Sequence, residues 1–136
     1  MKKTAALFLL CACALCACGK LKGQFAWKTA EMDAYRQMTD DMEFASDKPV
    51  DWVFAFDRVS GVRYIYVVLQ KKELVWVDIK KETIETDKTS PFVHGRIGNL
   101  EPGEYQIVLA EKEHRIADKR FVVYDPEDDA PDNGEE

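Results

Sequence analysis

Alternation of apolar and polar residues dominates the middle of this 136-residue chain. Between about residues 43 and 124, short runs with β-branched or aromatic residues at every second position are separated by turn residues such as Ser60-Gly61 and Ser90-Pro91. The expected strands are 50–57, 62–70, 74–79, 92–97, 104–110 and 119–124. No strong helix lies between them to make parallel crossovers, so the pattern predicts an all-β, antiparallel sandwich of about seven strands.

One turn carries more information than the others. Residues 100–105 read Leu-Glu-Pro-Gly-Glu-Tyr, which resembles the corner before strand F in fibronectin type III and bacterial immunoglobulin-like domains. There the tyrosine hydroxyl bonds back to the backbone a few residues upstream. The resemblance implies an immunoglobulin-like sandwich over residues 43–124, with Leu100, Pro102, Gly103 and Tyr105 as its structural motif. A plain Pro-Gly hairpin turn is the alternative.

The N-terminus is typical of an export signal. Lys2 and Lys3 are followed by an uncharged apolar run from Ala5 to Cys18, which is too short to cross about 30 Å of hydrocarbon as a permanent helix. The run ends in Leu15-Cys16-Ala17-Cys18, which resembles the lipobox of bacterial lipoproteins. The resemblance implies a signal peptide over residues 1–17, cleavage after Ala17, and a diacylglycerol with further acyl chains such as palmitate on Cys18. An ordinary signal cut at Ala12-Cys13-Ala14 is the alternative.

The lipobox resemblance also implies a location. Two or three acyl chains hold a small domain stably on a bilayer. In bacteria with two membranes, the residue after the lipidated cysteine influences sorting, and Gly19 stands where an aspartate would resemble an inner-membrane retention signal. We therefore expect a cell-envelope protein that is lipid-anchored at the outer membrane, with the inner membrane as the weaker alternative.

Residues 18–42 are expected to form the lipidated N-terminus and a tether. Within this segment the apolar residues fall three or four apart, which is a helical spacing. They are Met32, Tyr35, Met38 and Met42. The spacing predicts a short helix over residues 29–42, and strands around Phe25–Lys28 or Met42–Ala45 are the alternative.

The charge distribution argues against nucleic acid as a partner. The formal net charge of -6 arises mostly from residues 125–136, which contain seven acidic residues and no basic one. This acidic tail is expected to be disordered, and its order of residues does not match an EF-hand calcium loop. Residues 19–124 contain 17 basic and 18 acidic residues, whereas a nucleic-acid-binding domain normally has an excess of Lys and Arg.

Neither a metal site nor a catalytic motif is evident. The cysteines have metal-like spacing but lie in the predicted signal segment, so no metal or other cofactor is expected. They are Cys11, Cys13, Cys16 and Cys18. The two histidines, His94 and His114, belong to no recognisable catalytic motif. The sequence therefore predicts a protein that is not an enzyme and has no small-molecule substrate.

The best candidate for a partner-binding surface is a second apolar face on the strands at 62–70 and 74–79. It carries Tyr64, Tyr66 and Trp76, with Val68 and Leu74 beside them and Arg63, Lys71 and Lys72 flanking them. Since a sandwich buries only one face of each sheet, something should cover this one. The favoured interpretation is that the segment with Met32, Tyr35 and Met38 covers it; the alternative is a protein or glycan partner.

Two classes of function remain. The first is a non-enzymatic binding or scaffold module of the envelope, whose partner is another envelope protein. The second is a periplasmic inhibitor or chaperone that uses loops such as Ser60-Gly61 or Lys112–Arg115. An inhibitor needs a long, stiff, exposed loop, and the loops expected here are short. The sequence therefore favours the first class.

Overall fold

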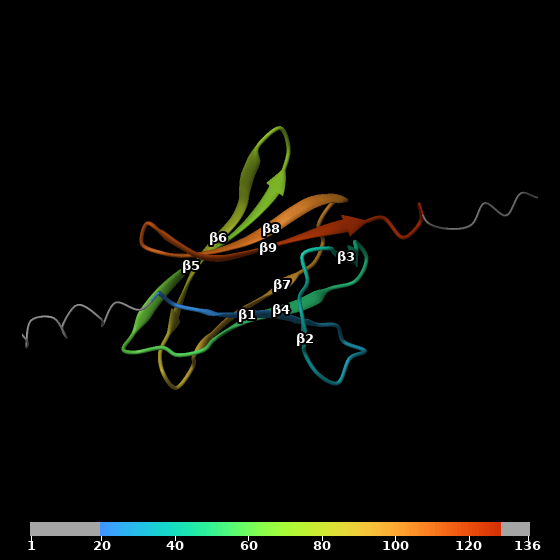
Figure 1. The fold of residues 1–136 in the computed structure, drawn as a ribbon. Coiled ribbons are helices and arrows are strands. Elements are labelled where there is room, and N and C mark those ends of the chain that lie inside the picture. Colours follow the sequence, from blue (N-terminus) through green and yellow to red (C-terminus); the bar gives the residue numbers. More distant parts are fainter. Residues whose placement is uncertain (1–19, 129–136) are drawn as a thin grey trace, which may run out of the picture.

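Two β-sheets packed face to face form the part of the chain that the structure, a computed structural model, describes, residues 20–128 (Figure 1). The four-stranded sheet has the order β2-β1-β4-β7, and the five-stranded sheet has the order β3-β9-β8-β5-β6. The strands are β1 (Gly23–Lys28), β2 (Arg36–Gln37), β3 (Met42–Ala45), β4 (Val50–Phe56), β5 (Arg63–Lys72), β6 (Trp76–Thr86), β7 (Phe92–Ile97), β8 (Gly103–Glu111) and β9 (His114–Tyr124). All pairings are antiparallel except that of β3 with β9.

The strand order is that of an immunoglobulin-like sandwich. Strands β1, β4 and β7 correspond to strands A, B and E of such a domain and share one sheet. Strands β5, β8 and β9 correspond to C, F and G and share the other sheet, with β6 added beside β5. The prediction of an all-β, antiparallel, immunoglobulin-like sandwich is confirmed.

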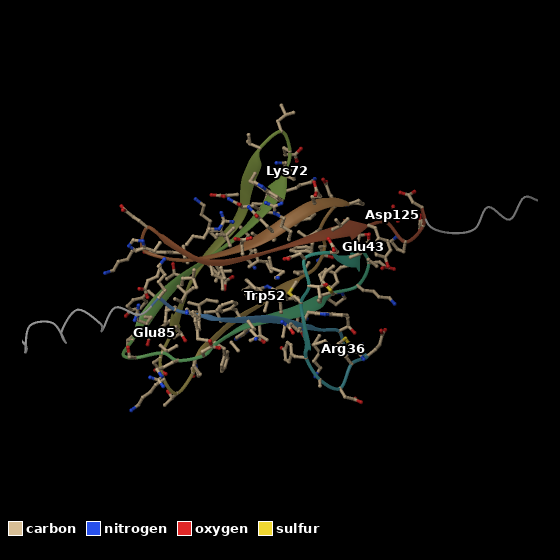
Figure 2. All side chains as sticks on the ribbon, in the orientation of Figure 1. Arg36, Glu43, Trp52, Lys72, Glu85 and Asp125 are labelled. Atoms are coloured by element: carbon tan, nitrogen blue, oxygen red, sulfur yellow. The ribbon has the colours of Figure 1, made fainter. Side chains whose placement is uncertain are left out.

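Period-two alternation places the core between the sheets. On β4, for example, Val50, Trp52, Phe54 and Phe56 are buried, and every second residue between them is less buried. Trp52 lies between the two sheets (Figure 2). It packs directly on Gly95 of β7, where an added Cβ would lie 2.8 Å from the indole Nε1. Only glycine leaves room for the indole at this position.

The turn at residues 100–105 has the geometry of a tyrosine corner. The hydroxyl of Tyr105 donates a hydrogen bond to the carbonyl oxygen of Glu101, 2.6 Å away. The ring of Tyr105 is buried and stacks on Phe121 at a centroid distance of 5.6 Å. Gly103 has a φ of 156°, and a Cβ there would lie 3.2 Å from Lys71 Cε. A plain Pro-Gly turn would not need the bond from the hydroxyl to the backbone.

The predicted helix over residues 29–42 is wrong. No residue between 20 and 128 is helical, so no helix in that range could span a membrane. Both alternative strands are present instead: β1 pairs with β4 over six residues, and β3 pairs with β9. The backbone N–H of Met38 donates to the carbonyl of Phe25, and the Met38 side chain is buried in the core. The sandwich therefore begins at Gly23, before the expected boundary at residue 43.

The hairpin of β5 and β6 also differs from expectation. The strand expected at 74–79 is β6, which runs to Thr86, and the turn expected at Lys71-Lys72 lies instead at residues 73–75. The pairing register shifts between Leu69 and Gln70, which leaves Ile79 of β6 without a partner residue. A bulge of this kind bends and twists the strands. The end of the hairpin accordingly projects beyond the other strands of the five-stranded sheet (Figure 1).

Candidate binding surface

Tyr64 and Tyr66 point outward from the five-stranded sheet. Their exposed fractions are 57% and 44%, whereas the alternating residues Ile65 and Val67 are buried in the core. Tyr66 is paired with Thr83 on β6 and with Ala110 on β8, and both of these neighbours are smaller. The two phenol rings therefore stand above their surroundings on the outer face of the sheet.

The N-terminal segment does not cover this face, so the favoured interpretation is wrong. The segment joins β1 to β2, at the edge of the other sheet. Met38 is buried in the core, and Tyr35 is exposed with Lys28 Nζ 6.0 Å from its ring centroid. The backbone pairing of β1 with β4 holds the segment on the opposite side of the molecule from Tyr64 and Tyr66.

The end of the β5–β6 hairpin adds exposed aliphatic side chains. We call residues 72–79 the hairpin tip; its exposed apolar members are Leu74, Val75, Val77 and Ile79. The exposed fraction is 99% for Leu74 and 66% for Val75. In the sequence, alternation separates Val75, Val77 and Ile79 from Leu74 and Trp76 on the strand expected at 74–79. It does not show that the hairpin extends beyond the opposing sheet, where neither face has a partner.

Trp76 is separated from the two tyrosines. It is paired with Lys72, six residues beyond Tyr66 along β5, which is about 20 Å of strand. Its ring is half-buried and close to two cations, with Lys72 Nζ 5.1 Å and Arg120 Cζ 5.6 Å from the centroid. The structure therefore does not bring Tyr64, Tyr66 and Trp76 together as one aromatic patch.

A row of polar side chains lies between the two groups. Gln106 of β8 is buried and donates to Gln70 Oε1, and Gln70 Nε2 donates to Asp78 Oδ1 at 2.6 Å. The bond from Gln70, followed by the contact with Lys81, lowers the pKa of Asp78 below its ordinary value. These bonds join β8, β5 and β6 at the base of the hairpin tip.

Two of the predicted flanking cations lie on the other face of β5. Arg63 binds Glu111 of β8 through two hydrogen bonds of 2.6 and 2.7 Å. This interaction holds the pKa of Glu111 below its ordinary value, although partial burial opposes the effect. Lys71 also points inward, so of the three cations only Lys72 is beside an aromatic residue of the outer face.

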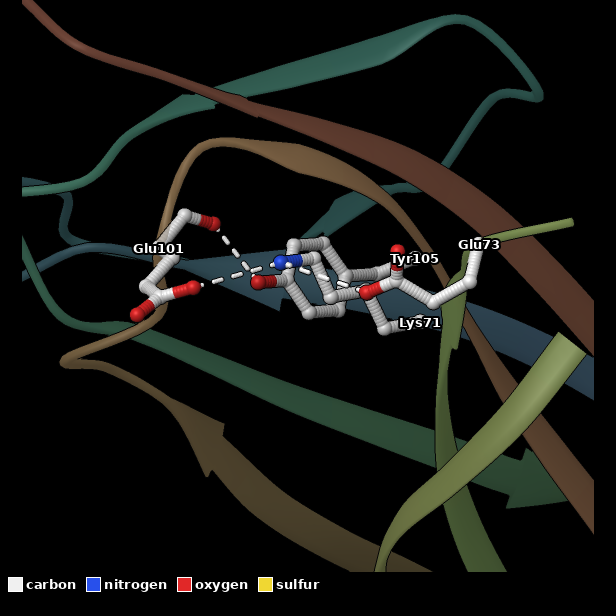
Figure 3. Close-up of polar contacts among 4 residues, drawn as sticks. All are labelled: Lys71, Glu73, Glu101 and Tyr105. Carbon is white, nitrogen blue, oxygen red and sulfur yellow. Dashed lines mark hydrogen bonds and ion pairs between the residues drawn. The ribbon is translucent and has the colours of Figure 1, made fainter.

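Lys71 connects the hairpin to the tyrosine corner (Figure 3). Its Nζ lies 3.3 Å from Glu101 Oε2, 3.7 Å from Glu73 Oε1 and 5.9 Å from the ring centroid of Tyr105. The hydrogen bond to Glu101 raises the pKa of Lys71. Burial raises the pKa of Tyr105. The residue beside the apex of the hairpin is thus linked to the best-defined turn of the sandwich.

The described residues contain no group of three or more His, Cys, Asp or Glu side chains that could hold a metal ion. A groove along β8 and β9 is lined mainly by carboxylates: Asp40, Asp41, Glu43, Glu104 and Asp118, with Arg120. His94 and His114 are exposed on β7 and β9. The absence of catalysis stays a prediction.

The loops considered for an inhibitor are short. The loop between β4 and β5, with Ser60-Gly61, spans residues 57–62 and is held by the buried Val59. The segment 112–115 forms a two-residue turn, with Lys112 at a φ of 53°, and the first residues of β9. The hairpin tip presents more exposed apolar side chains than either of these loops.

The predicted lipidation and cleavage residues, Leu15, Ala17 and Cys18, lie outside the described residues, as do Gly19 and most of the acidic tail. The signal peptide, the anchor and the tail are therefore predictions from the sequence.

No protein-family model matches the sequence, and no curated protein matches it. Among solved structures, the chain is similar to an immunoglobulin-like protein from Pseudomonas aeruginosa, with 12% identity, a TM-score of 0.48, and coverage of 77% of this chain and 95% of that chain. It is also similar to a superoxide reductase (neelaredoxin) from Ignicoccus hospitalis, with 13% identity, a TM-score of 0.44, and coverage of 75% of this chain and 82% of that chain. The immunoglobulin-like assignment rests on the strand order and tyrosine corner of this chain itself.

Proposed function

We propose that this chain is a non-enzymatic binding module of the bacterial cell envelope. In this proposal, Cys18 carries the lipid that holds the protein at the outer membrane, and the β5–β6 hairpin contacts another envelope protein. The observation that carries the proposal is the exposure of Tyr64 and Tyr66 on a face that no other part of residues 20–128 covers.

The energetics of exposed apolar side chains support a binding role. Single exposed apolar residues are common on protein surfaces, but a group of them on one element is typical of an interaction site. Tyrosine is enriched among the residues that contribute most to interface affinity, because its ring buries a large area and its hydroxyl still forms hydrogen bonds. Tyr64, Tyr66 and the exposed residues of the hairpin tip all belong to one β-hairpin.

The lipobox and the position of β1 support the proposed anchor. The sandwich begins at Gly23, so at most about 17 Å of extended chain joins it to Cys18. A tether of this length keeps the domain beside the membrane and limits its partners to proteins that are close to the same surface.

Metabolic labelling tests the anchor. Labelled palmitate should enter the wild-type protein but not the Cys18→Ser variant, and that variant should leave the membrane fraction. The anchor is refuted if the wild type takes up no label and the Cys18→Ser variant stays membrane-bound.

A pull-down from detergent-solubilised envelope tests binding. We expect the wild-type protein to retain a specific protein. The Tyr64→Ser/Tyr66→Ser variant should retain at least tenfold less of that protein. Tyr35→Ser, which alters an exposed tyrosine directly before β2 of the other sheet, is the matched control and should bind normally. Trp76 is kept unchanged, because it lies close to Lys72 and Arg120 and its loss would disturb the hairpin. Equal retention by all three proteins would contradict the proposed surface.

A further inference from the structure

The hairpin tip is held in place although its apolar side chains are exposed. Glu73 N–H donates to the carbonyl of Val75 across the turn, at 2.9 Å. Lys71 Nζ joins Glu73 to Glu101 of the tyrosine corner (Figure 3). Gln70 joins Asp78 to Gln106 of β8. An element that is already ordered loses little conformational entropy on binding. Because Leu74 and Val75 are exposed on an ordered element, they are better suited to docking into a partner than they would be on a flexible loop.

Cations surround the base of the tip. Lys72 and Arg120 both lie within 6 Å of the centroid of the Trp76 ring, and neither forms an ion pair within residues 20–128. By contrast, Glu73 and Asp78 are each within 4 Å of a lysine, Lys71 and Lys81 respectively. The tip therefore presents an aliphatic apex with two cations behind it, Lys72 and Arg120, of which Arg120 also borders the carboxylates of the groove along β8 and β9. This positive charge complements an apolar site bordered by negative charge.

The tip also lies far from the point where the chain enters the sandwich. The carbonyl of Lys22 accepts a hydrogen bond from Asp57 N–H, and Gly23 pairs with Phe56, so the entry point is at the Arg63 end of β5. From there β5 runs about 30 Å to Lys72. Figure 2 shows Lys72 on the projecting hairpin and Glu85 at the opposite end of β6. In the proposed function, a tether of about 17 Å therefore joins the membrane to the end of the domain that lies opposite the tip.

We propose that the hairpin tip inserts Leu74 and Val75 into an apolar pocket of a partner protein whose rim carries carboxylates, and that Lys72 and Arg120 face that rim. This inference rests on the proposed function and names the contact element and the chemistry of the partner. Tyr64 and Tyr66 then form a second contact, at least about 20 Å along β5 from Lys72 of the inserted tip.

Two other occupants fit the observations less well. In a symmetric contact between the tips of two copies, the cations at Lys72 and Arg120 would meet like charges, and Lys80 and Lys81 disfavour pairing along the β6 edge. Insertion into a bilayer would bring the exposed Glu73 into the interface beside Leu74. It would also require the tip to reach the membrane that holds the opposite end of the domain.

Site-specific photo-crosslinking in intact cells tests the inference. A photoreactive residue replaces Val75 in the full-length, lipidated protein, and the matched control places it at Phe92, which is also an exposed apolar residue but lies on β7 of the other sheet. We expect a discrete heavier adduct from position 75 and none from position 92. Leu74→Ser should reduce the adduct at least tenfold, and Leu74→Met should restore it. Lys72→Gln should weaken it and make it less sensitive to salt.

Each other result overturns the inference. An adduct at twice the mass of the protein identifies a second copy as the occupant, and the absence of any adduct leaves solvent or lipid at the tip. An adduct that Leu74→Ser does not change shows that the partner contacts another surface. If the pull-down still depends on Tyr64 and Tyr66 in these cases, the proposed function stands while the inference about the tip fails.

Discussion

At the scale of single residues, the side chain of Tyr105 stabilises the tyrosine corner. The Tyr105 hydroxyl bonds the Glu101 carbonyl from within the core, while Lys71 lies above the same ring. Burial of a phenol hydroxyl costs free energy unless the hydroxyl is hydrogen-bonded. This one bond therefore joins the start of β8 to the turn that precedes it.

Replacement of Tyr105 by Phe should lower the free energy of unfolding by about 0.5–1.5 kcal/mol, because it removes one hydrogen bond and keeps the ring. Urea denaturation measures the change. Tyr35→Phe, at an exposed site, serves as the control and should leave the midpoint unchanged. No loss of stability in Tyr105→Phe would mean that the bond does not contribute.

The contact between Trp52 and Gly95 gives a second prediction at this scale. Trp52→Ala should cost about 3–5 kcal/mol through the cavity it leaves, and Gly95→Ala about 1–3 kcal/mol through its clash with the indole. In the Trp52→Ala background, the added methyl at position 95 should cost much less, because the ring it meets is gone. Additive losses in denaturation experiments would refute the direct contact.

At the scale of the strands, the ion pair between Arg63 and Glu111 responds to pH. The two hydrogen bonds from Arg63 to Glu111 join β5 to β8 and lower the pKa of the Glu111 carboxyl from its ordinary value of 4.5. A lowered pKa in the folded state means that the stabilisation is complete above pH 4.5 and is lost as the pH falls through the lowered value.

Accordingly, Glu111→Gln should reduce stability at neutral pH and have a smaller effect at a pH below the lowered pKa, where the wild-type carboxyl is also protonated. Thermal melts across this pH range measure the difference between the two proteins. A constant difference at every pH would show that the ion pair is not its origin.

The hairpin tip should be dispensable for folding. Leu74→Ser should change the free energy of unfolding by no more than about 0.5 kcal/mol, because its side chain is exposed. Ile107→Ala, in the buried row of β8, should cost about 2–5 kcal/mol. A large loss for Leu74→Ser would mean that the tip packs against the domain instead of facing outward.

The difference between buried and exposed rows of residues explains what the sequence could predict. Alternation identified β4, β5, β7 and β8 because each of these strands has one row of residues in the core. It did not reveal that Val75, Val77 and Ile79 are exposed, since alternation separates two faces but does not show whether an opposing sheet covers either one. The helical spacing of Met32, Tyr35 and Met38 predicted a helix that the pairing of β1 with β4 overrules. Tyr64 and Tyr66 were identified correctly as outward-facing, but their exposure depends on the path of the N-terminal segment.

At the scale of the whole molecule, the two ends of the five-stranded sheet have different roles in this account. The chain enters at the Arg63 end, close to the proposed lipid anchor, and the hairpin tip lies beyond the other end. The acidic groove lined by Asp40, Asp41 and Glu104 borders β8 and β9, whereas the tyrosines lie toward β6. The described residues therefore present chemically distinct surfaces at different places on the five-stranded sheet.

Hydroxyl-radical footprinting tests the central claim most directly, because it compares side-chain accessibility in native envelopes with that in the purified protein. The account predicts that oxidation of Tyr64, Tyr66 and Leu74 falls several-fold in the envelope, while oxidation of Tyr35 on the other sheet is unchanged. Equal oxidation of Tyr64, Tyr66 and Leu74 in both samples would contradict the account, since the hairpin would then have no partner in the cell.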